Sequence, residues 1–289
     1  MIAGGKATKR SRYGFTIDDQ AKGTVNASRT VMEAGLKVHV IDSEWKANDV
    51  SPSEVEVLLG LFPSIRTYIT LAARRRDVEQ LVRLYLPMLE DAGNSGICIV
   101  AGNKVYLEGE ELSTDPCSSI LKVLKLVYGR VSKIMLGVEG VESRIVNIIS
   151  TYPDVELFYL YDEMKVETIA EHAKSGVRTA VYVPYAIDRS PNDVVKALSD
   201  YALRRKWLRE EIRGMGYQAS QALKFSNAPA ELSKVISKAV SRLSIYGSKN
   251  EVVEKLRRLR DCGVSTIVGL PVFESPDQVH AFSECLKSV

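Results

Sequence analysis

The sequence is short of the residues from which many metal and catalytic sites are built. Its four cysteines form no C-x-x-C pair, and only three histidines accompany them. Zinc sites need closely spaced cysteine and histidine ligands, so no metal site is expected. Cysteines without a pairing pattern are the norm in a reducing compartment, so we expect a cytoplasmic protein.

Several sequence motifs are also missing, and each missing motif excludes a class of protein. No uninterrupted apolar run reaches about 18 residues, the length that indicates a transmembrane helix, so no membrane span is expected. There is no P-loop and no Ser-His-Asp constellation, and no G-x-G-x-x-G follows the first predicted strand. The formal net charge of +3 is too small to indicate nucleic-acid binding. No nucleic-acid or membrane partner is therefore expected.

The chain is long enough for one α/β barrel or two small domains, with 289 residues of which 45% are hydrophobic. Residues 1–11 contain glycine and several basic side chains but lack the apolar segment of a signal peptide. We expect them to form a mobile leader, with residues 12–289 forming one barrel domain.

A helix, a glycine and a short apolar strand follow one another four times along the chain. In the copy YGSKNEVVEKLRRLRDCGVSTIVGLPV, Ser248 and Glu251 have capping-box spacing, and Gly263 ends the helix. The strand after Gly263 is apolar without alternation, which is typical of a parallel sheet covered on both faces. The other copies cover residues 33–42, 91–102 and 173–186.

In total, eight strands are predicted, each followed by a helical pattern. They cover residues 12–17, 37–42, 65–72, 96–101, 132–138, 155–161, 178–184 and 264–270. This alternation predicts a single (β/α)8 TIM barrel, with a doubly wound open sheet as the alternative. Two connections are unusually long. Residues 103–116 are expected to form a small hairpin. A helical excursion before the last strand is expected to contain one long helix over 194–212 and another over 232–243.

The active site of such a barrel lies at the carboxyl ends of its strands. Asp42 and Glu44 follow the second predicted strand and are the acid–base candidates, although Asp42 could instead cap a turn. Trp45 beside them could stack on a ligand or close the barrel end. The three arginines at 74–76 could attract an anionic ligand or form a surface charge run.

Small residues mark other strand ends. The turn Gly137-Val138-Glu139-Gly140 stands between a strand and a helix, where backbone amides can approach a phosphate. A tight turn that needs positive φ is an equally good interpretation. Ala72-Ala73 and Ala101-Gly102 would leave flat space for a planar ring, although small residues also occur wherever packing is tight. Tyr185 ends the seventh predicted strand.

The order of these pieces resembles the bacterial-luciferase-like barrel flavoenzymes, nearest the archaeal deazaflavin-dependent methylenetetrahydromethanopterin reductases. YGSKNEVVEKLRRLRDCGVSTIVGLPV is similar to the last helix and strand of that family. GVRTAVYVPYAIDRSPNDVVKALSDYAL is similar to its seventh strand and long helix. KIMLGVEGVESRIVNII is similar to the strand whose turn holds the cofactor phosphate, and KVHVIDSEW and IRTYITLAARR resemble the second and third strands.

The resemblance implies an oxidoreductase that transfers hydride with a deazaflavin (coenzyme F420), or with FMN, to a small or pterin-linked substrate. It also implies a homodimer, the common state of family members. Residue by residue, Gly137, Val138, Glu139 and Gly140 would hold the phosphate, Thr70, Leu71 and Ala72 would back the ring, and Ala101 and Gly102 would flank it. Glu44, with Asp42 beside it, would supply the proton. Trp45, Arg74 and Tyr185 are the candidates for substrate contact.

Two alternatives remain open. Asp42-Ser43-Glu44 stands where the family more commonly has an Asp-His pair, and the turn after the fourth strand contains only one glycine. These departures favour a cofactor-free relative that acts as a binding or assembly protein. The other alternative is a barrel lyase or isomerase that uses Asp42 or Glu44 as a base on a phosphorylated substrate.

Overall fold

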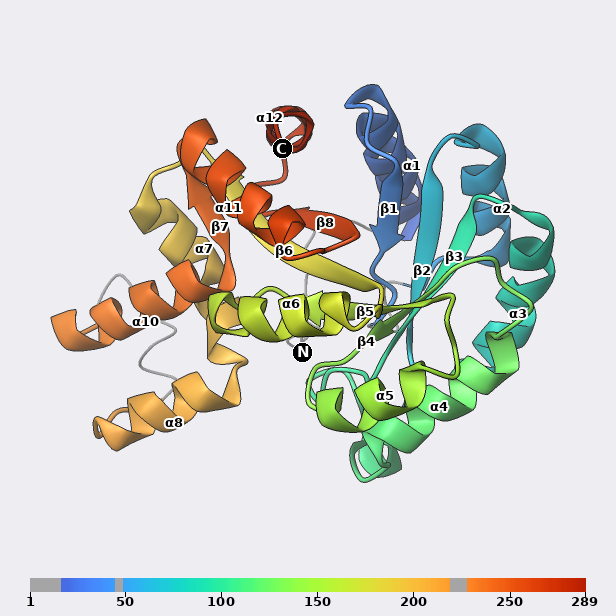
Figure 1. The fold of residues 1–289 in the computed structure, drawn as a ribbon, viewed down its shortest axis with the longest axis horizontal. Helices are drawn as coiled ribbons and strands as arrows, with labels where there is room; N and C mark the ends of the chain where they lie inside the picture. The colour runs from blue at the N-terminus through green and yellow to red at the C-terminus, as the bar shows by residue number, and fades with distance from the viewer. Residues whose placement is uncertain (1–16, 45–48, 219–227) are drawn as a thin grey trace, which may run out of the picture. The chain divides into compact units, whose positions relative to one another are not determined.

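A computed structural model describes residues 17–44, 49–218 and 228–289, with side chains described from residue 23 onward. The contacts of the chain divide it into two compact units, Met1–Ile134 (unit 1) and Met135–Val289 (unit 2). In both units, parallel strands alternate with helices (Figure 1). The predicted α/β class is therefore confirmed.

Unit 1 is built on three parallel neighbours, β1, β2 and β3. Its elements are α1 (Ile17–Glu33), β1 (Val38–Ile41), α2 (Pro52–Leu61), β2 (Arg66–Ala72), α3 (Val78–Asp91), β3 (Ser95–Val100), the 3-10 helix η2 (Gly109–Leu112) and α4 (Pro116–Val127). Val38 lies opposite Arg66, and Ala72 lies opposite Val100. The last residues of β2 and β3 lie opposite each other in the sheet. The segments that follow these two strands therefore begin side by side.

Local sequence signals explain where the helices of unit 1 begin and which face they bury. Ser51 accepts the backbone N–H of Glu54, and the Glu54 carboxylate accepts the N–H of Ser51, so the Ser-Pro start of α2 is a complete capping box. Val78, Val82 and Leu89 are buried along one face of α3, which contacts β3. These contacts anchor α3 on β3.

Unit 2 is organised around its longest strand, β6. Its elements are β4 (Ile134–Gly137, starting one residue before the unit boundary), α5 (Glu142–Ile149), β5 (Val155–Leu160), the 3-10 helix η3 (Glu163–Lys165), α6 (Val166–Lys174), β6 (Thr179–Ile187), α7 (Pro191–Leu203), α8 (Lys206–Gly214), α10 (Ala230–Leu243), β7 (Ile245–Gly247), α11 (Lys249–Asp261), β8 (Thr266–Pro271) and α12 (Pro276–Lys287). Tyr185 of β6 pairs with both Ile245 and Pro271, so β7 and β8 lie on opposite edges of this strand.

The helical excursion of unit 2 has its own apolar core. Helices α7, α8 and α10 contact one another and lie together in Figure 1. Val194, Leu208, Ile236 and Leu243 belong to one buried cluster that joins them. The second predicted helix of the excursion, over 232–243, is confirmed as α10.

The first predicted helix of the excursion is wrong in its length. The segment 194–212 forms two helices, because the backbone of Arg205 is extended and ends the path of α7. The Arg209 guanidinium donates hydrogen bonds to the carbonyl oxygens of Leu203 at 2.9 Å and Arg204 at 2.7 Å. These bonds satisfy carbonyl groups that a continuous helix would have paired internally.

Three other predictions differ from the structure or lie outside it. The predicted leader and residues 12–16 of the first predicted strand are outside the described residues, and Ile17 begins α1 rather than ending a strand. Residues 103–116 contain no strand; reciprocal bonds between Glu108 and Glu111 close the η2 turn instead of a hairpin. Strand β7 was not predicted, since three residues are too few to show a periodicity. Within the described ranges, no helix is long and apolar enough to cross a membrane.

Candidate functional site

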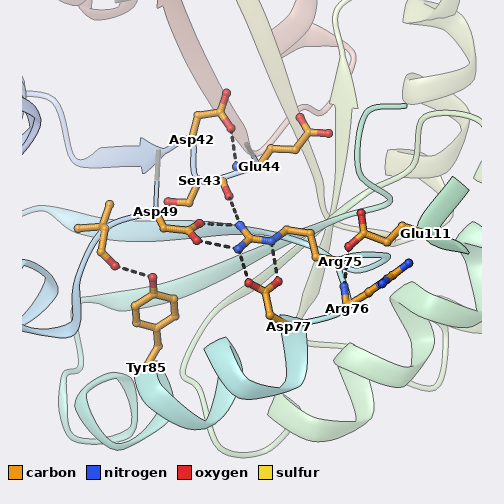
Figure 2. Close-up of polar contacts among 10 residues, drawn as sticks. Asp42, Ser43, Glu44, Asp49, Arg75, Arg76, Asp77, Tyr85 and Glu111 are labelled. Carbon is orange, nitrogen blue, oxygen red and sulfur yellow. Dashed lines mark hydrogen bonds and ion pairs between the residues drawn. The ribbon is translucent and has the colours of Figure 1, made fainter. Parts of the chain in front are cut away.

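The loop after β1 carries the two acid–base candidates. The Asp42 carboxylate accepts the backbone N–H of Glu44 at 3.0 Å, so the interpretation of Asp42 as a turn-capping residue is confirmed (Figure 2). Ser43 between them is buried, and its hydroxyl has no hydrogen-bond partner among the described residues. Trp45 lies outside the described residues. The acid–base role of Asp42 and Glu44 remains a prediction.

Arg75, which follows β2, holds this loop in place (Figure 2). Its guanidinium donates to both carboxylate oxygens of Asp49 at 2.6 Å and to both of Asp77 at 2.9 and 2.8 Å. A further N–H donates to the carbonyl of Ser43 at 3.3 Å. Burial lowers the pKa of Arg75, but the two aspartates outweigh burial and raise it overall. Arg75 therefore ties the loop after β1 to the start of α3.

Arg74, the preceding residue, has different partners. Its Nε donates to the carbonyl of Ala101 at 2.8 Å, and its Nη2 donates to the carbonyl of Gly102 at 2.5 Å. Arg74 and Arg75 are only 7% and 5% exposed, so a surface charge run is wrong for both, whereas Arg76 is exposed. The structure thus brings together two predicted site positions, Arg74 and the turn after β3.

The residues predicted to back a planar ring are buried at the end of β2. Thr70, Leu71 and Ala72 are 6%, 1% and 1% exposed. Gly102 has a φ of +93°, and a Cβ placed there would lie 3.2 Å from Leu107 and 3.4 Å from Ala72. Leu107 thus packs closely against the space that the small residues create. The described residues contain no cis peptide bond.

The turn after β4 carries the residues predicted to hold a phosphate. The N–H of Val141 donates to the carbonyl of Val138 at 3.0 Å, and Gly140 has a φ of +75°. The tight-turn interpretation is therefore confirmed. A Cβ on Gly140 would have no heavy atom within 4 Å, so the turn is open on that side. Val138 is buried under the turn, whereas Gly137 is partly exposed.

Two cations that the sequence analysis did not identify lie beside this turn. Arg205 donates to Glu139 at 3.2 Å, and Lys165 Nζ lies 3.6 Å from Glu139 and 3.3 Å from Glu142. The Arg205 side chain is 11% exposed and that of Glu139 is 49% exposed. Arg205 Nε and Glu142 Oε1 are buried without a hydrogen-bond partner among the described residues. The polar network beside the turn is therefore incomplete.

Tyr185, a candidate for substrate contact, lies within the packing of unit 2. Its ring is 2% exposed and stacks on Phe282 of α12 with 4.1 Å between the ring centroids. A Cβ on Gly269 would lie 2.5 Å from Phe282 and 2.8 Å from Tyr185, so the stack requires glycine at this position of β8. Burial raises the pKa of the Tyr185 hydroxyl, which keeps it protonated.

The three histidines lie in β1, α6 and α12. His39 lies in β1, where its Nδ1 is 2.8 Å from the hydroxyl of Ser28. His172 lies in α6 and contacts the hydroxyl of Tyr159, and His280 lies in α12. In the part of the chain that the structure describes, no group of three or more histidine, cysteine or carboxylate side chains could hold a metal ion.

Solved structures with the same fold span nearly the whole chain. A coenzyme F420-dependent tetrahydromethanopterin reductase from Methanopyrus kandleri matches with a TM-score of 0.63 and 14% identity, over 92% of this chain and 95% of that chain. An F420-dependent secondary alcohol dehydrogenase, solved with an F420-acetone adduct, matches with a TM-score of 0.60 and 9% identity, over 97% and 96%. The oxygenating constituent of 3,6-diketocamphane monooxygenase from Pseudomonas putida, solved with FMN, matches with a TM-score of 0.55 and 11% identity, over 97% and 94%.

These matches show that the chain shares the fold of two F420-dependent enzymes and of a monooxygenase solved with FMN, and at such identities they establish the fold alone. The resemblance inferred from the sequence is confirmed at this level. Residues 24–279 match the model of a family of unknown function, DUF7388, and the chain belongs to this family. No curated protein matches the sequence.

Proposed function

We propose that the protein is a luciferase-like oxidoreductase that positions a deazaflavin, coenzyme F420, for hydride transfer to a small or pterin-linked substrate. FMN is the alternative cofactor. The observation that carries this proposal is the fold shared with two F420-dependent enzymes, a reductase and an alcohol dehydrogenase, over more than nine-tenths of each chain. The family resemblance leads us to propose a homodimer, and the unpaired cysteines lead us to propose a cytoplasmic location.

The residues after β4 fit the phosphate of such a cofactor. Gly140 leaves open space beside the turn, and Arg205 and Lys165 supply positive charge there. The Nε of Arg205, which has no hydrogen-bond partner among the described residues, is a further buried donor that an anion could use. We therefore assign Gly137, Val138, Glu139 and Gly140 to the phosphate, with Arg205 and Lys165 as additional partners.

The strand ends of unit 1 supply the remaining assignments. The bound cofactor would supply the hydride chemistry, while the protein orients it and excludes water. Thr70, Leu71 and Ala72 would back the ring, and Ala101 and Gly102 would flank it. The carboxyl group of Glu44 would hold the proton that the substrate receives, and Asp42 keeps the Glu44 backbone in a fixed turn.

A cofactor-free binding protein of the same fold is the second candidate function. Two observations favour it. Glu139 already pairs with both cations beside the phosphate turn, and Leu107 packs against Gly102 where the ring would be flanked. A phosphate would have to displace Glu139, whereas a protein without a cofactor would keep these contacts.

Cofactor titration separates the two candidates. The purified protein is titrated with coenzyme F420 and with FMN, and fluorescence reports binding. Gly140→Asp places a carboxylate at the phosphate turn and is expected to weaken binding at least tenfold, to order of magnitude. Gly129→Asp is the matched control, because Gly129 has a similar φ of +77° and the same open surroundings but lies after α4.

Saturable micromolar binding that Gly140→Asp weakens and Gly129→Asp preserves is the expected result. If neither cofactor binds up to about millimolar concentration, the oxidoreductase proposal fails and the cofactor-free relative is favoured. If Gly140→Asp and Gly129→Asp weaken binding equally, the assignment of the phosphate to the turn after β4 is wrong.

A further inference from the structure

Arg74 is a nearly buried cation that is held by neutral groups. Its Nε and Nη2 donate to the carbonyl oxygens of Ala101 and Gly102, at 2.8 and 2.5 Å. No other hydrogen bond or ion pair of Arg74 exists among the described residues, although its side chain is only 7% exposed. A buried charge without a contacting counter-charge is costly, so this arrangement needs an explanation.

The charges around Arg74 do not compensate for its burial. Burial lowers the pKa of the Arg74 guanidinium, and the attraction of Glu44 and Glu111 only partly offsets this effect. At Arg75 the balance is reversed, because Asp49 and Asp77 contact the guanidinium directly. Arg74 therefore differs from Arg75 in having no carboxylate in direct contact with its guanidinium among the described residues.

The hydrogen bonds of Arg74 leave one edge of the guanidinium plane available. Nε and Nη2 share the edge that faces the two carbonyls. The outer edge, formed by Nη1 and the second N–H of Nη2, presents two parallel donors, the geometry that matches a carboxylate bidentately. We propose that Arg74 binds the carboxylate group of a small-molecule ligand through this edge.

A singly charged carboxylate fits better than a phosphate. Glu44 and Glu111 lie close enough to act electrostatically on Arg74, and they would repel a doubly charged group more strongly. Arg75 offers no second cation, since two aspartates occupy its guanidinium. Arg74 alone therefore supplies one positive charge and one pair of donors.

The carbonyl contacts also position Arg74 for this role. Ala72 and Val100 are register partners at the ends of β2 and β3, so Arg74 follows one strand and its two carbonyl partners follow the other. The identification of this carboxylate as part of the substrate of a hydride transfer rests on the proposed function. The binding of a carboxylate by Arg74 does not depend on the proposed function.

The test uses the full-length protein without added cofactor, together with three probes that share a phenyl ring. Benzoate, benzamide and phenyl phosphate are titrated while the Arg74 Nε–H resonance is followed by nitrogen-15 NMR. The resonance is assigned by its loss in Arg74→Lys and by its proximity to Ala101 and Gly102. Benzoate is expected to shift it saturably, and benzamide, which lacks the charge, is expected to bind at least tenfold more weakly, to order of magnitude.

Arg76→Lys is the matched control, since Arg76 is exposed and is expected to leave benzoate binding unchanged. Equal responses to benzoate and benzamide, or none to either, would overturn the proposal. Phenyl phosphate binding tenfold more tightly than benzoate would overturn the carboxylate assignment. If Arg74→Lys does not fold, the comparison of probes on the unaltered chain still decides. Because no cofactor is present, failure here is separate from failure of the cofactor titration.

Discussion

Both the strand ends of unit 1 and the turn after β4 in unit 2 combine arginines with carboxylates. The two regions differ in how many of these polar groups have hydrogen-bond partners. Around Arg75, both aspartates and a carbonyl accept hydrogen bonds from one guanidinium. Around Arg205, one carboxylate is shared between two cations, and a guanidinium nitrogen has no partner among the described residues. A complete network stabilises the loop that it holds, whereas an incomplete one leaves donors for a ligand.

The same contrast applies to the glycines of the two regions. Both Gly102 and Gly140 have positive φ. Leu107 and Ala72 pack against the first, and no heavy atom lies within 4 Å of a Cβ at the second. Glycine is therefore required by packing and conformation at position 102, and by conformation alone at position 140.

The largest expected effect comes from breaking the complete network. Arg75→Met should lower the free energy of unfolding by about 3 kcal/mol, because it leaves Asp49 and Asp77 without their shared cation. Lys165→Met, in the incomplete network, should change it by less than about 0.5 kcal/mol, since that side chain is 33% exposed. Urea unfolding measures both. Equal losses would contradict the comparison.

A second effect tests the burial of His39 in unit 1. Burial lowers the pKa of His39 to about 4, below the unfolded value near 6.5. The unfolded chain therefore binds a proton first, and stability that is present above about pH 6.5 is lost as the pH falls toward 4. We expect a loss of about 2 kcal/mol, somewhat less than full burial would give, because the ring is only part-buried.

The free energy of unfolding is measured between pH 4 and pH 7 for this purpose. His39→Gln carries an amide that does not titrate, and its profile should be flatter across this window. Parallel profiles for the two proteins would show that another group causes the pH dependence.

The smallest expected effect separates the two glycines. Gly140→Ala should cost about 1 kcal/mol, because only the positive φ opposes it. Gly102→Ala should cost about 1 kcal/mol more, since its Cβ would also press on Leu107 at 3.2 Å. Thermal or urea unfolding resolves this difference. A larger cost at Gly140 would mean that the turn after β4 is not open.

The parts of the fold that the sequence predicted are those with strong local signals. Ser248 accepts the backbone amide of Glu251 at the start of α11 as their spacing indicated, and Gly263 has positive φ at the end of that helix. The break between α7 and α8 depends on the Arg209 side chain, whose contacts leave no periodic trace. Apolar spacing continued across the break, so the sequence indicated one helix where there are two.

Less of the candidate site could be predicted from the sequence, because the residues that interact there are far apart along the chain. The identity of Asp49 does not show that it faces Arg75, which lies 26 residues away. Arg205 and Glu139 are 66 residues apart. The run of three arginines was conspicuous, but only tertiary structure shows that Arg75 is neutralised, that Arg74 rests on carbonyl groups and that Arg76 is exposed.

The apolar cluster that joins α7, α8 and α10 has a consequence for motion. Val194, Leu208 and Ile236 belong to one buried cluster that also includes Ala186 of β6, and the end of α7 is closed by a side chain of α8. A group of helices that shares a buried cluster and has side-chain hydrogen bonds at its helix ends can open and close as one cooperative folding unit. Amide hydrogens of these helices would then exchange as a group, at a rate of their own, while those of β6 stay protected.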